Sequence, residues 1–134
     1  MPVMKHETMP VRSENDVVAV RQAVRKWSAE LGFSLVDQTK IVTAASELAR
    51  NVLVHGGGGT TRLESLTEGS RRGLRLIFED QGPGIPNIEL ALRDGYTTGG
   101  GLGLGLGGSK RLVNEFDIVS RVGEGTRVSV TRWK

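Results

Sequence analysis

Three groups of residues in this sequence have types and spacings that suit chemistry. Glu47 and Asn51 lie four residues apart, and this spacing places two side chains on one stripe of a helix. A second group is the stretch Asp80-x-Gly82-x-Gly84, and a third is a run with seven glycines between Gly99 and Gly108. The sequence thus combines a carboxylate and an amide, a second carboxylate beside bare backbone, and a long segment of unshielded N–H groups.

Each group suggests a ligand. The neutral oxygen of Asn51 suits Mg²⁺, a hard cation that takes few protein ligands and completes its shell with phosphate and water. Glu47, close to such a metal, could accept a proton from an attacking hydroxyl. The acid at Asp80, next to positions where a ligand can lie against backbone, suits a flat base with an amino group, such as adenine. We expect Glu47 and Asn51 to lie beside the apolar face of their helix rather than within it.

These interpretations have simpler alternatives. Glu47 could be a solvated carboxylate that pairs with Arg50 at i,i+3, and Asn51 an ordinary helix amide. Asp80 could serve only the turn that it starts. The glycine run could be a flexible linker. His55 continues the stripe of Glu47 and Asn51, but a single histidine without a second His or Cys is more often structural than a metal ligand.

Known glycine-rich motifs do not explain the run by themselves. Gly103-x-Gly105-x-x-Gly108 matches the dinucleotide-binding pattern, which must follow directly from a strand, whereas residues 94–98 have the composition of a loop. The order Gly108-Ser109-Lys110 is wrong for a phosphate-binding loop of the Walker type, in which the lysine precedes the hydroxyl. The chain also has no H-R-D or D-F-G sequence, so the glycine loop of eukaryotic-type protein kinases lacks its companions.

Hydrophobic periodicity predicts the elements that must position these residues. Capping signals at Ser13 and Ser34 open two helices, the first ending near Leu31 before Gly32 and the second at the Gly56–Gly59 break. The remaining expected elements are strands at Met4–Val11 (an edge strand, because of Pro10), Thr60–Thr67, Gly73–Glu79, Asp117–Val122 and Thr126–Trp133, a short helix from Pro86 to Leu92, and a helix from Leu104 to Phe116. This order predicts an α+β fold with helices on one face of a mostly antiparallel sheet.

Composition limits the class of protein. A chain of 134 residues with 37% hydrophobic and 25% charged residues is typical of one globular domain, so we expect a single domain over residues 1–134. The absence of cysteine fits the cytoplasm, and no apolar run approaches the length of a membrane span, so we expect no membrane partner. The net charge of +3 is scattered rather than gathered in a stripe, which argues against nucleic acid as a partner.

The three groups occur in the order and spacing of the Bergerat fold, the ATPase domain of gyrase, Hsp90, histidine kinases and MutL, also called the GHKL superfamily. The resemblance extends over essentially the whole chain and implies a two-layer α/β sandwich. The stretches "SELARN", "YTTGGGLGLGLGGSKRLVNEF" and "VTRWK" resemble, within that superfamily, the stressosome switch serine/threonine kinases more than the anti-sigma kinases.

The resemblance implies a role for each residue. Asn51 corresponds to the Mg²⁺ ligand, Glu47 to the general base and Asp80 to the anchor for the adenine of ATP. Gly82 and Gly84 correspond to the floor of the nucleotide pocket, and Thr126 matches a position that reaches adenine in relatives, although a strand threonine on the solvent face fits equally well. The lid over ATP is assigned to Gly101, Gly103, Gly105 and Gly107, with phosphates at the start of the following helix.

The resemblance also implies partners. The expected substrates are STAS-domain scaffold and antagonist proteins of the stressosome, and the expected downstream partner is a serine phosphatase that the kinase activates after release. The exposed face of the first helix around Arg21 and Arg25 is our expected contact surface. Two alternatives remain open: an anti-sigma kinase that binds a sigma factor and phosphorylates a STAS anti-anti-sigma factor, and a non-catalytic adapter that keeps only the nucleotide pocket.

Overall fold

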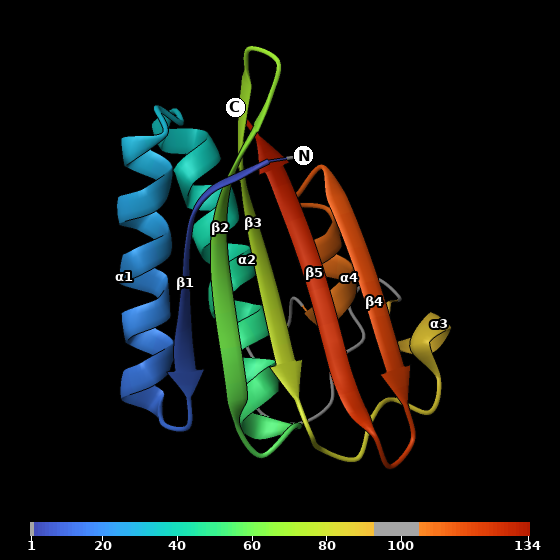
Figure 1. Ribbon diagram of the computed structural model, residues 1–134. Helices are drawn as coiled ribbons and strands as arrows, with labels where there is room; N and C mark the ends of the chain where they lie inside the picture. Colours follow the sequence, from blue (N-terminus) through green and yellow to red (C-terminus); the bar gives the residue numbers. More distant parts are fainter. Residues whose placement is uncertain (1, 93–104) are drawn as a thin grey trace.

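The computed structural model describes residues 2–92 and 105–134. Its sheet combines strands from the first half of the chain with strands from the C-terminal end (Figure 1). In chain order the described elements are β1 (Val3–Val11), α1 (Glu14–Glu30), α2 (Leu35–Val54), β2 (Gly59–Glu68), β3 (Arg71–Asp80), α3 (Ile88–Ala91), α4 (Gly105–Lys110), β4 (Glu115–Arg121) and β5 (Gly125–Trp133).

The five strands form one sheet in the order β1-β2-β3-β5-β4, and every neighbouring pair is antiparallel. Helices α2 and α4 lie behind the sheet as it is seen in Figure 1, and α1 stands beside the edge strand β1 and packs against α2, so the architecture has one layer of helices and one of strands. The predicted α+β class is therefore confirmed. The first strand lies at the sheet edge, as expected from Pro10.

Side-chain caps begin both long helices where the sequence predicts them. The Ser13 hydroxyl accepts a hydrogen bond from the Asp16 N–H at 3.2 Å, and the Ser34 hydroxyl accepts one from the Asp37 N–H at 3.1 Å. These bonds satisfy amide groups that the first turn of a helix leaves without a partner. Gly32 follows α1 with φ +86°, a conformation that glycine adopts without strain.

The last predicted helix is wrong in its extent. We expected a helix from Leu104 to Phe116, but α4 ends at Lys110 and Phe116 belongs to β4. The chain leaves the helix because β4 pairs with β5, beginning where the Asn114 N–H donates to the Thr131 carbonyl at 2.9 Å. The helix expected from Pro86 to Leu92 is likewise shorter, since Asn87 caps it and only Ile88–Ala91 is helical.

The core lies between the sheet and α1–α2. Ile41, Ala45, Leu48 and Val52 of α2 are buried, as their helical periodicity predicts, and Leu74, Leu76 and Phe78 of β3 are buried opposite them. Full burial of one such large side chain contributes about 1.5–3 kcal/mol. This core fixes α2 against β3, the two elements that carry Glu47, Asn51 and Asp80. None of the helices in the described part of the chain is both long and apolar enough to span a membrane.

Candidate functional site

A cavity of about 380 Å³ lies between α2, the end of β3 and the loop that leads to α3. This volume falls within the range of small-molecule sites. Its polar lining includes Glu47, Asn51, Asp80 and Thr126, and its apolar lining includes Leu48, Val52, Phe78, Ile85, Leu106 and Val128. The structure therefore brings together five predicted site residues, these four and Gly84, that lie up to 79 positions apart in the sequence, with apolar walls suited to a flat ring.

Glu47 is more deeply placed than its sequence pattern predicts. Only 5% of the residue is exposed, whereas we expected it beside the apolar face of the helix. The reason is tertiary packing, because α4 contacts α2 and its Leu106 lines the same cavity as Glu47. The alternative of a pair with Arg50 is not what the structure forms, since Arg50 contacts Glu14 at 3.6 Å. Within the described residues no hydrogen bond is donated to the Glu47 carboxylate, which faces the cavity.

Asp80 serves a turn and lines the cavity at the same time. Its Oδ1 accepts a hydrogen bond from the Gly82 N–H at 2.9 Å, as the turn interpretation predicts. Asp80 also lines the cavity, half-buried, at the last position of β3. One carboxylate oxygen is thus held by the backbone, which fixes the side chain and leaves the other oxygen for a second partner.

The two glycines after Asp80 have different surroundings. Gly84 lines the cavity with φ +78°, and a Cβ on it would overlap the Arg121 carbonyl oxygen, so the loop can approach β4 only with glycine here. Gly82 does not line the cavity, and a Cβ on it would lie 2.7 Å from the Cα of Gly56. Because Gly82 has no Cβ, the turn after Asp80 can lie close to the backbone of Gly56.

Thr126 lies beside Asp80 on the neighbouring strand. The two residues are Cα partners across β3 and β5, and both line the cavity. Thr126 is half-buried, and its Oγ1 lies 2.7 Å from the Ser120 hydroxyl oxygen. Thr126 therefore lines the cavity, and its contact with adenine stays a prediction.

Two of the four glycines assigned to the lid fall outside the described residues. Gly101 and Gly103 lie there, whereas Gly105 begins α4 and Gly107 lies within it. The neighbouring Leu106 is buried and contributes to the cavity wall. The end of the glycine run is thus adjacent to the site, and its action as a lid stays a prediction.

Sequence reasoning missed Gly56, which we interpreted only as part of a helix stop. A Cβ on Gly56 would overlap the Asp80 side chain, so this glycine lets the end of α2 approach the end of β3. The four-glycine run after α2 was the available signal, because a break that long exceeds what ending a helix requires. Ser120 was also missed, since a serine in a strand carries no local signal.

The donor set fits a metal that takes few ligands from the protein. In the parts of the chain that the structure describes, no group of three His, Cys, Asp or Glu side chains could hold a metal ion. The amide of Asn51 does line the cavity, half-buried and one turn from Glu47. Mg²⁺ bound mainly through phosphates and water is compatible with such a site.

A salt bridge holds the start of α2, the helix that carries Glu47 and Asn51. Arg132 on β5 donates to Asp37 Oδ1 at 2.6 Å and to the Leu112 carbonyl at 3.0 Å. The hydrogen bond from Arg132 lowers the pKa of Asp37 below its ordinary value. The same guanidinium therefore links the start of α2, the segment after α4 and β5.

Comparison with known proteins identifies a family and relatives for this chain. Residues 36–134 match the family of histidine kinase-, DNA gyrase B- and HSP90-like ATPases. The chain is 48% identical to the serine/threonine-protein kinase RsbT of Bacillus subtilis, over 92% of both chains. It is 31% identical to an anti-sigma F factor of Anoxybacillus flavithermus, over 95% of this chain and 90% of that one. An anti-sigma F factor of Clostridium kluyveri is 32% identical over 87% of this chain and 84% of that protein.

Solved structures agree on the fold. A crystal structure of the RsbU and RsbW domains of a Mycobacterium tuberculosis protein matches with a TM-score of 0.63 at 24% identity. The match covers 100% of this chain, which spans 33% of that one. The histidine kinase domain of a blue-light activated kinase from Erythrobacter litoralis matches with a TM-score of 0.54 at 20% identity, over 92% of this chain and 60% of that one.

The fold, the cavity and the family match together define the class: the chain belongs to the histidine kinase-, DNA gyrase B- and HSP90-like ATPases. Within this family it is a serine/threonine kinase homologous to RsbT. As a kinase of an ATPase family it uses ATP. The fold expected from the resemblance, the Bergerat fold, is confirmed.

Proposed function

We propose that this chain transfers the γ-phosphoryl group of MgATP to a serine or threonine of a STAS-domain scaffold or antagonist protein. The observation that carries the proposal is the cavity, which has Asp80 and Thr126 on the sheet side and Glu47 and Asn51 on α2. One region suits a base with an amino group and the other suits a reacting phosphate. The relatives named as RsbT and anti-sigma F factors support a kinase of this kind.

Asp80 anchors adenine in this proposal. Its Oδ1 is held by the Gly82 N–H, and the free oxygen accepts from the exocyclic amine of the base. The apolar lining from Phe78, Ile85 and Val128 removes the ring from water. A hydrogen bond to a charged acceptor is worth about 1.5–3 kcal/mol, so this contact distinguishes adenine from bases without the amine.

Glu47 is the general base. The hydroxyl oxygen of the partner forms a bond to the γ-phosphorus, the bond from that phosphorus to the bridging oxygen breaks, and ADP leaves with the electron pair. The hydroxyl proton passes to the Glu47 carboxylate, which is buried at the cavity wall. Asn51 would hold Mg²⁺, which neutralises phosphate charge when it is bound.

The glycine run completes the site. Gly101, Gly103, Gly105 and Gly107 form a lid whose backbone approaches the phosphates, since residues without a Cβ let N–H groups come close to an anion. Leu106 places the end of this segment at the cavity wall. The lid holds ATP while the partner hydroxyl attacks.

Phosphorylation is the signal in a partner switch. The unphosphorylated STAS protein holds the kinase, and after phosphorylation the kinase is released and activates a serine phosphatase. Arg21 and Arg25 are exposed on α1 and form the proposed contact surface. The anti-sigma F factor relatives favour a second candidate, a kinase that binds a sigma factor, and a pull-down with a sigma factor and with the phosphatase separates the two.

The experiment follows both products of the switch. The chain is incubated with MgATP and a STAS protein, and mass spectrometry and size-exclusion chromatography follow the partner. We expect a gain of one phosphate on a serine or threonine and loss of the complex as it accumulates. A stable complex without phosphate transfer would instead support the non-catalytic adapter.

A further inference from the structure

Arg50 brings a positive charge to a cavity that also holds two carboxylates. It lines the cavity from α2, next to Asn51 and three residues after Glu47, and among the described lining residues it is the only arginine or lysine. Glu47 and Asp80 are the acidic residues of the same described lining. The proposed function assigns a role to these two carboxylates and to Asn51 but leaves Arg50 without one.

The ion pair that Arg50 forms is loose. Its Nη1 lies 3.6 Å from Oε1 of Glu14, whereas a charge-assisted hydrogen bond between such groups is about 2.7–2.9 Å long. The side chain of Glu14 is 64% exposed and that of Arg50 34% exposed. Water therefore screens the pair, and exposed pairs of this kind contribute little to stability. The guanidinium can exchange Glu14 for a stronger partner at little cost.

Glu14 lies outside the cavity, on the first turn of α1. Helix α1 begins and α2 ends at the same end of the molecule, where β3 also ends (Figure 1). Glu14 is not among the residues that line the cavity, whereas Arg50 is. Arg50 thus joins the cavity to a carboxylate beside it, and its long side chain has the rotational freedom to turn from one to the other.

A triphosphate in this cavity needs positive charge next to it. MgATP keeps a net negative charge, and the carboxylates of Glu47 and Asp80 in the same lining would repel it. The planar guanidinium of an arginine can donate two parallel hydrogen bonds to phosphate oxygens. Because a triphosphate carries more negative charge than the single carboxylate of Glu14, it is the stronger partner for Arg50.

We propose that Arg50 binds the phosphate chain of ATP and that Glu14 holds the guanidinium when the nucleotide is absent. The inference rests on the proposed function, because it takes this cavity as the ATP site. Glu14 therefore competes with ATP for Arg50. The two members of the ion pair have opposite effects on ATP affinity, although they contact each other.

The experiment measures binding of MgATP to the full chain by calorimetry in Arg50→Gln and Glu14→Gln. We expect Arg50→Gln to lower the affinity roughly tenfold or more, as for the loss of a hydrogen bond between charged groups. Glu14→Gln removes the competing charge and should raise the affinity roughly two- to fivefold, the range of an exposed ion pair. A pair that only fastens α1 to α2 would change the affinity in the same direction in both variants.

Adenosine shows whether Arg50 acts on the phosphates, because it carries the base without them. Its binding, followed by NMR titration because it is weak, should be equal in wild type, Arg50→Gln and Glu14→Gln. Lys40→Gln is the matched control, since it removes one positive charge from an exposed position of α2 that does not line the cavity. It should leave both affinities unchanged. In an Arg50→Gln background, Glu14→Gln should have no further effect.

Glu14→Gln keeps the inference testable even if Arg50→Gln does not fold, because Glu14 is exposed and outside the cavity. Urea unfolding checks that both variants are folded. Three results would overturn the inference: an ATP affinity of Arg50→Gln within about twofold of wild type, an equal loss for ATP and adenosine, or a Glu14→Gln that binds ATP more weakly than wild type.

Asp80→Asn separates this inference from the proposed function. It should weaken ATP and adenosine alike, because both carry the base. If it does so while Arg50→Gln leaves ATP affinity unchanged, the role of Arg50 is wrong and the base site stands. If Asp80→Asn leaves both affinities unchanged, the base site is wrong, and a loss of ATP binding alone in Arg50→Gln still supports Arg50 as the phosphate ligand.

Discussion

Asp80 holds a backbone N–H with one carboxylate oxygen and offers the other to the cavity. This division explains why an aspartate, rather than any other acceptor, suits the end of β3. An asparagine would keep the oxygen that accepts from Gly82 but would present an amide donor to the ligand. The two roles can therefore be separated by one substitution.

We predict that Asp80→Asn lowers ATP affinity by roughly 10- to 100-fold, because a charge-assisted hydrogen bond worth about 1.5–3 kcal/mol is lost. Calorimetry measures the affinity, with a fluorescent ATP analogue where binding is weak. Urea unfolding serves as the control and should stay close to wild type, since the bond from Gly82 can persist. Unchanged ATP affinity would remove Asp80 from the base site.

Glu47 is the proposed general base, and it is also buried at the cavity wall. Glu47→Gln preserves shape and removes the basic oxygen, so we expect phosphate transfer to fall by roughly 10²–10⁴-fold. Binding of MgATP and of the STAS partner should persist, and calorimetry and pull-down check both. Transfer near the wild-type rate, measured with radiolabelled ATP, would show that Glu47 is not the base.

At the scale of elements, the site depends on how closely the end of α2 approaches the end of β3. Gly56 makes this approach possible, because a Cβ there would overlap Asp80. The next residue, Gly57, has φ +74° and open space around its Cβ position. Substitution of Gly56 therefore tests the contact with Asp80, and substitution of Gly57 tests the effect of backbone strain without that contact.

We predict that Gly56→Ala lowers ATP affinity by at least roughly tenfold, since a displaced Asp80 loses its bond to the base. Gly57→Ala should cost about 1–2 kcal/mol of folding free energy through its left-handed backbone and leave ATP affinity unchanged. Calorimetry and urea unfolding of both variants provide the comparison. Equal ATP affinity in the two variants would mean that the contact with Asp80 does not matter.

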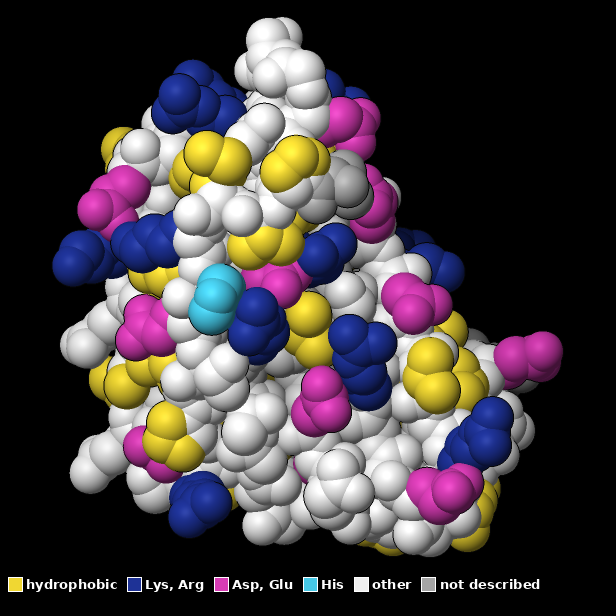
Figure 2. All heavy atoms as spheres, in the orientation of Figure 1, with side chains coloured by type: hydrophobic (Ala, Val, Ile, Leu, Met, Phe, Trp, Pro, Cys, Tyr) yellow, Lys and Arg dark blue, Asp and Glu magenta, His cyan; other side chains and the backbone are white. Residues whose placement is uncertain are grey.

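The face of the sheet that carries no helices has its own stabilising cluster on β2 and β3. Arg62 and Arg75 donate to the two oxygens of Glu64 at 2.8 and 2.6 Å. Figure 2 shows Lys and Arg side chains mixed with Asp and Glu on this face. Burial alone would raise the pKa of Glu64, but the hydrogen bonds from both arginines outweigh it and lower the pKa below 4.5.

The lowered pKa of Glu64 predicts how stability depends on pH. The contribution of Glu64 is complete above its unfolded-state pKa and is lost as pH falls through the lower folded-state pKa. We expect Glu64→Gln to reduce the free energy of unfolding by about 1–3 kcal/mol at pH 7. This difference from wild type should shrink below about pH 5. Urea unfolding between pH 7 and pH 3 measures it, and a constant difference would contradict the assignment.

At the scale of the whole molecule, the sequence predicts those features that depend on local patterns, such as helix starts and buried strand faces. Both long helices begin at the predicted caps, and the alternation in β3 identifies its buried face. The end of α4 and the burial of Glu47 were not predictable, because they depend on β4 pairing with β5 and on α4 packing against α2. Ser120 was not predicted for the same reason, since its hydrogen-bond partners come from other parts of the chain.

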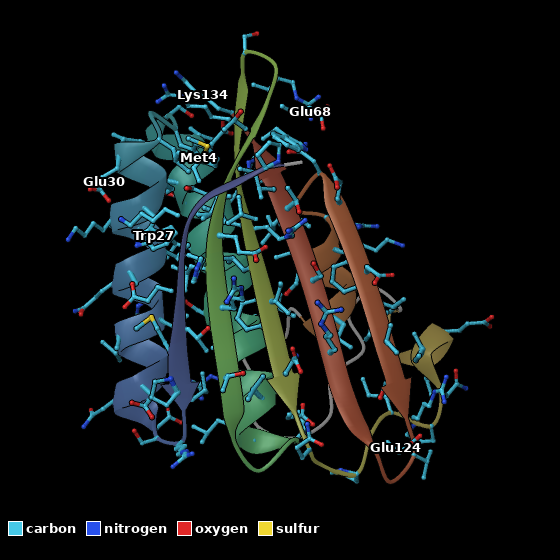
Figure 3. All side chains as sticks on the ribbon, viewed as in Figure 1. Met4, Trp27, Glu30, Glu68, Glu124 and Lys134 are labelled. Carbon is cyan, nitrogen blue, oxygen red and sulfur yellow. The ribbon has the colours of Figure 1, made fainter. Side chains whose placement is uncertain are left out.

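Contacts between residues distant in the sequence also join β1 to α1. Met4, Trp27 and Glu30 mark the place where β1 meets α1 (Figure 3), and Lys5 bridges the two by an ion pair with Glu30 and a contact over the Trp27 ring. Such contacts orient α1, and with it the exposed Arg21 and Arg25. The layer of helices thus carries both the proposed partner surface on α1 and the helix with Glu47 and Asn51, α2.

The central claim is that one cavity both binds ATP and transfers its phosphate, and the dependence of transfer rate on ATP concentration tests it most directly. Initial rates of phosphate transfer to the STAS partner are measured for wild type, Asp80→Asn and Glu47→Gln. We predict that Asp80→Asn raises the half-saturating ATP concentration and recovers most of the maximal rate. Glu47→Gln should lower the maximal rate and leave half-saturation near wild type. Wild-type curves for both variants would contradict the account.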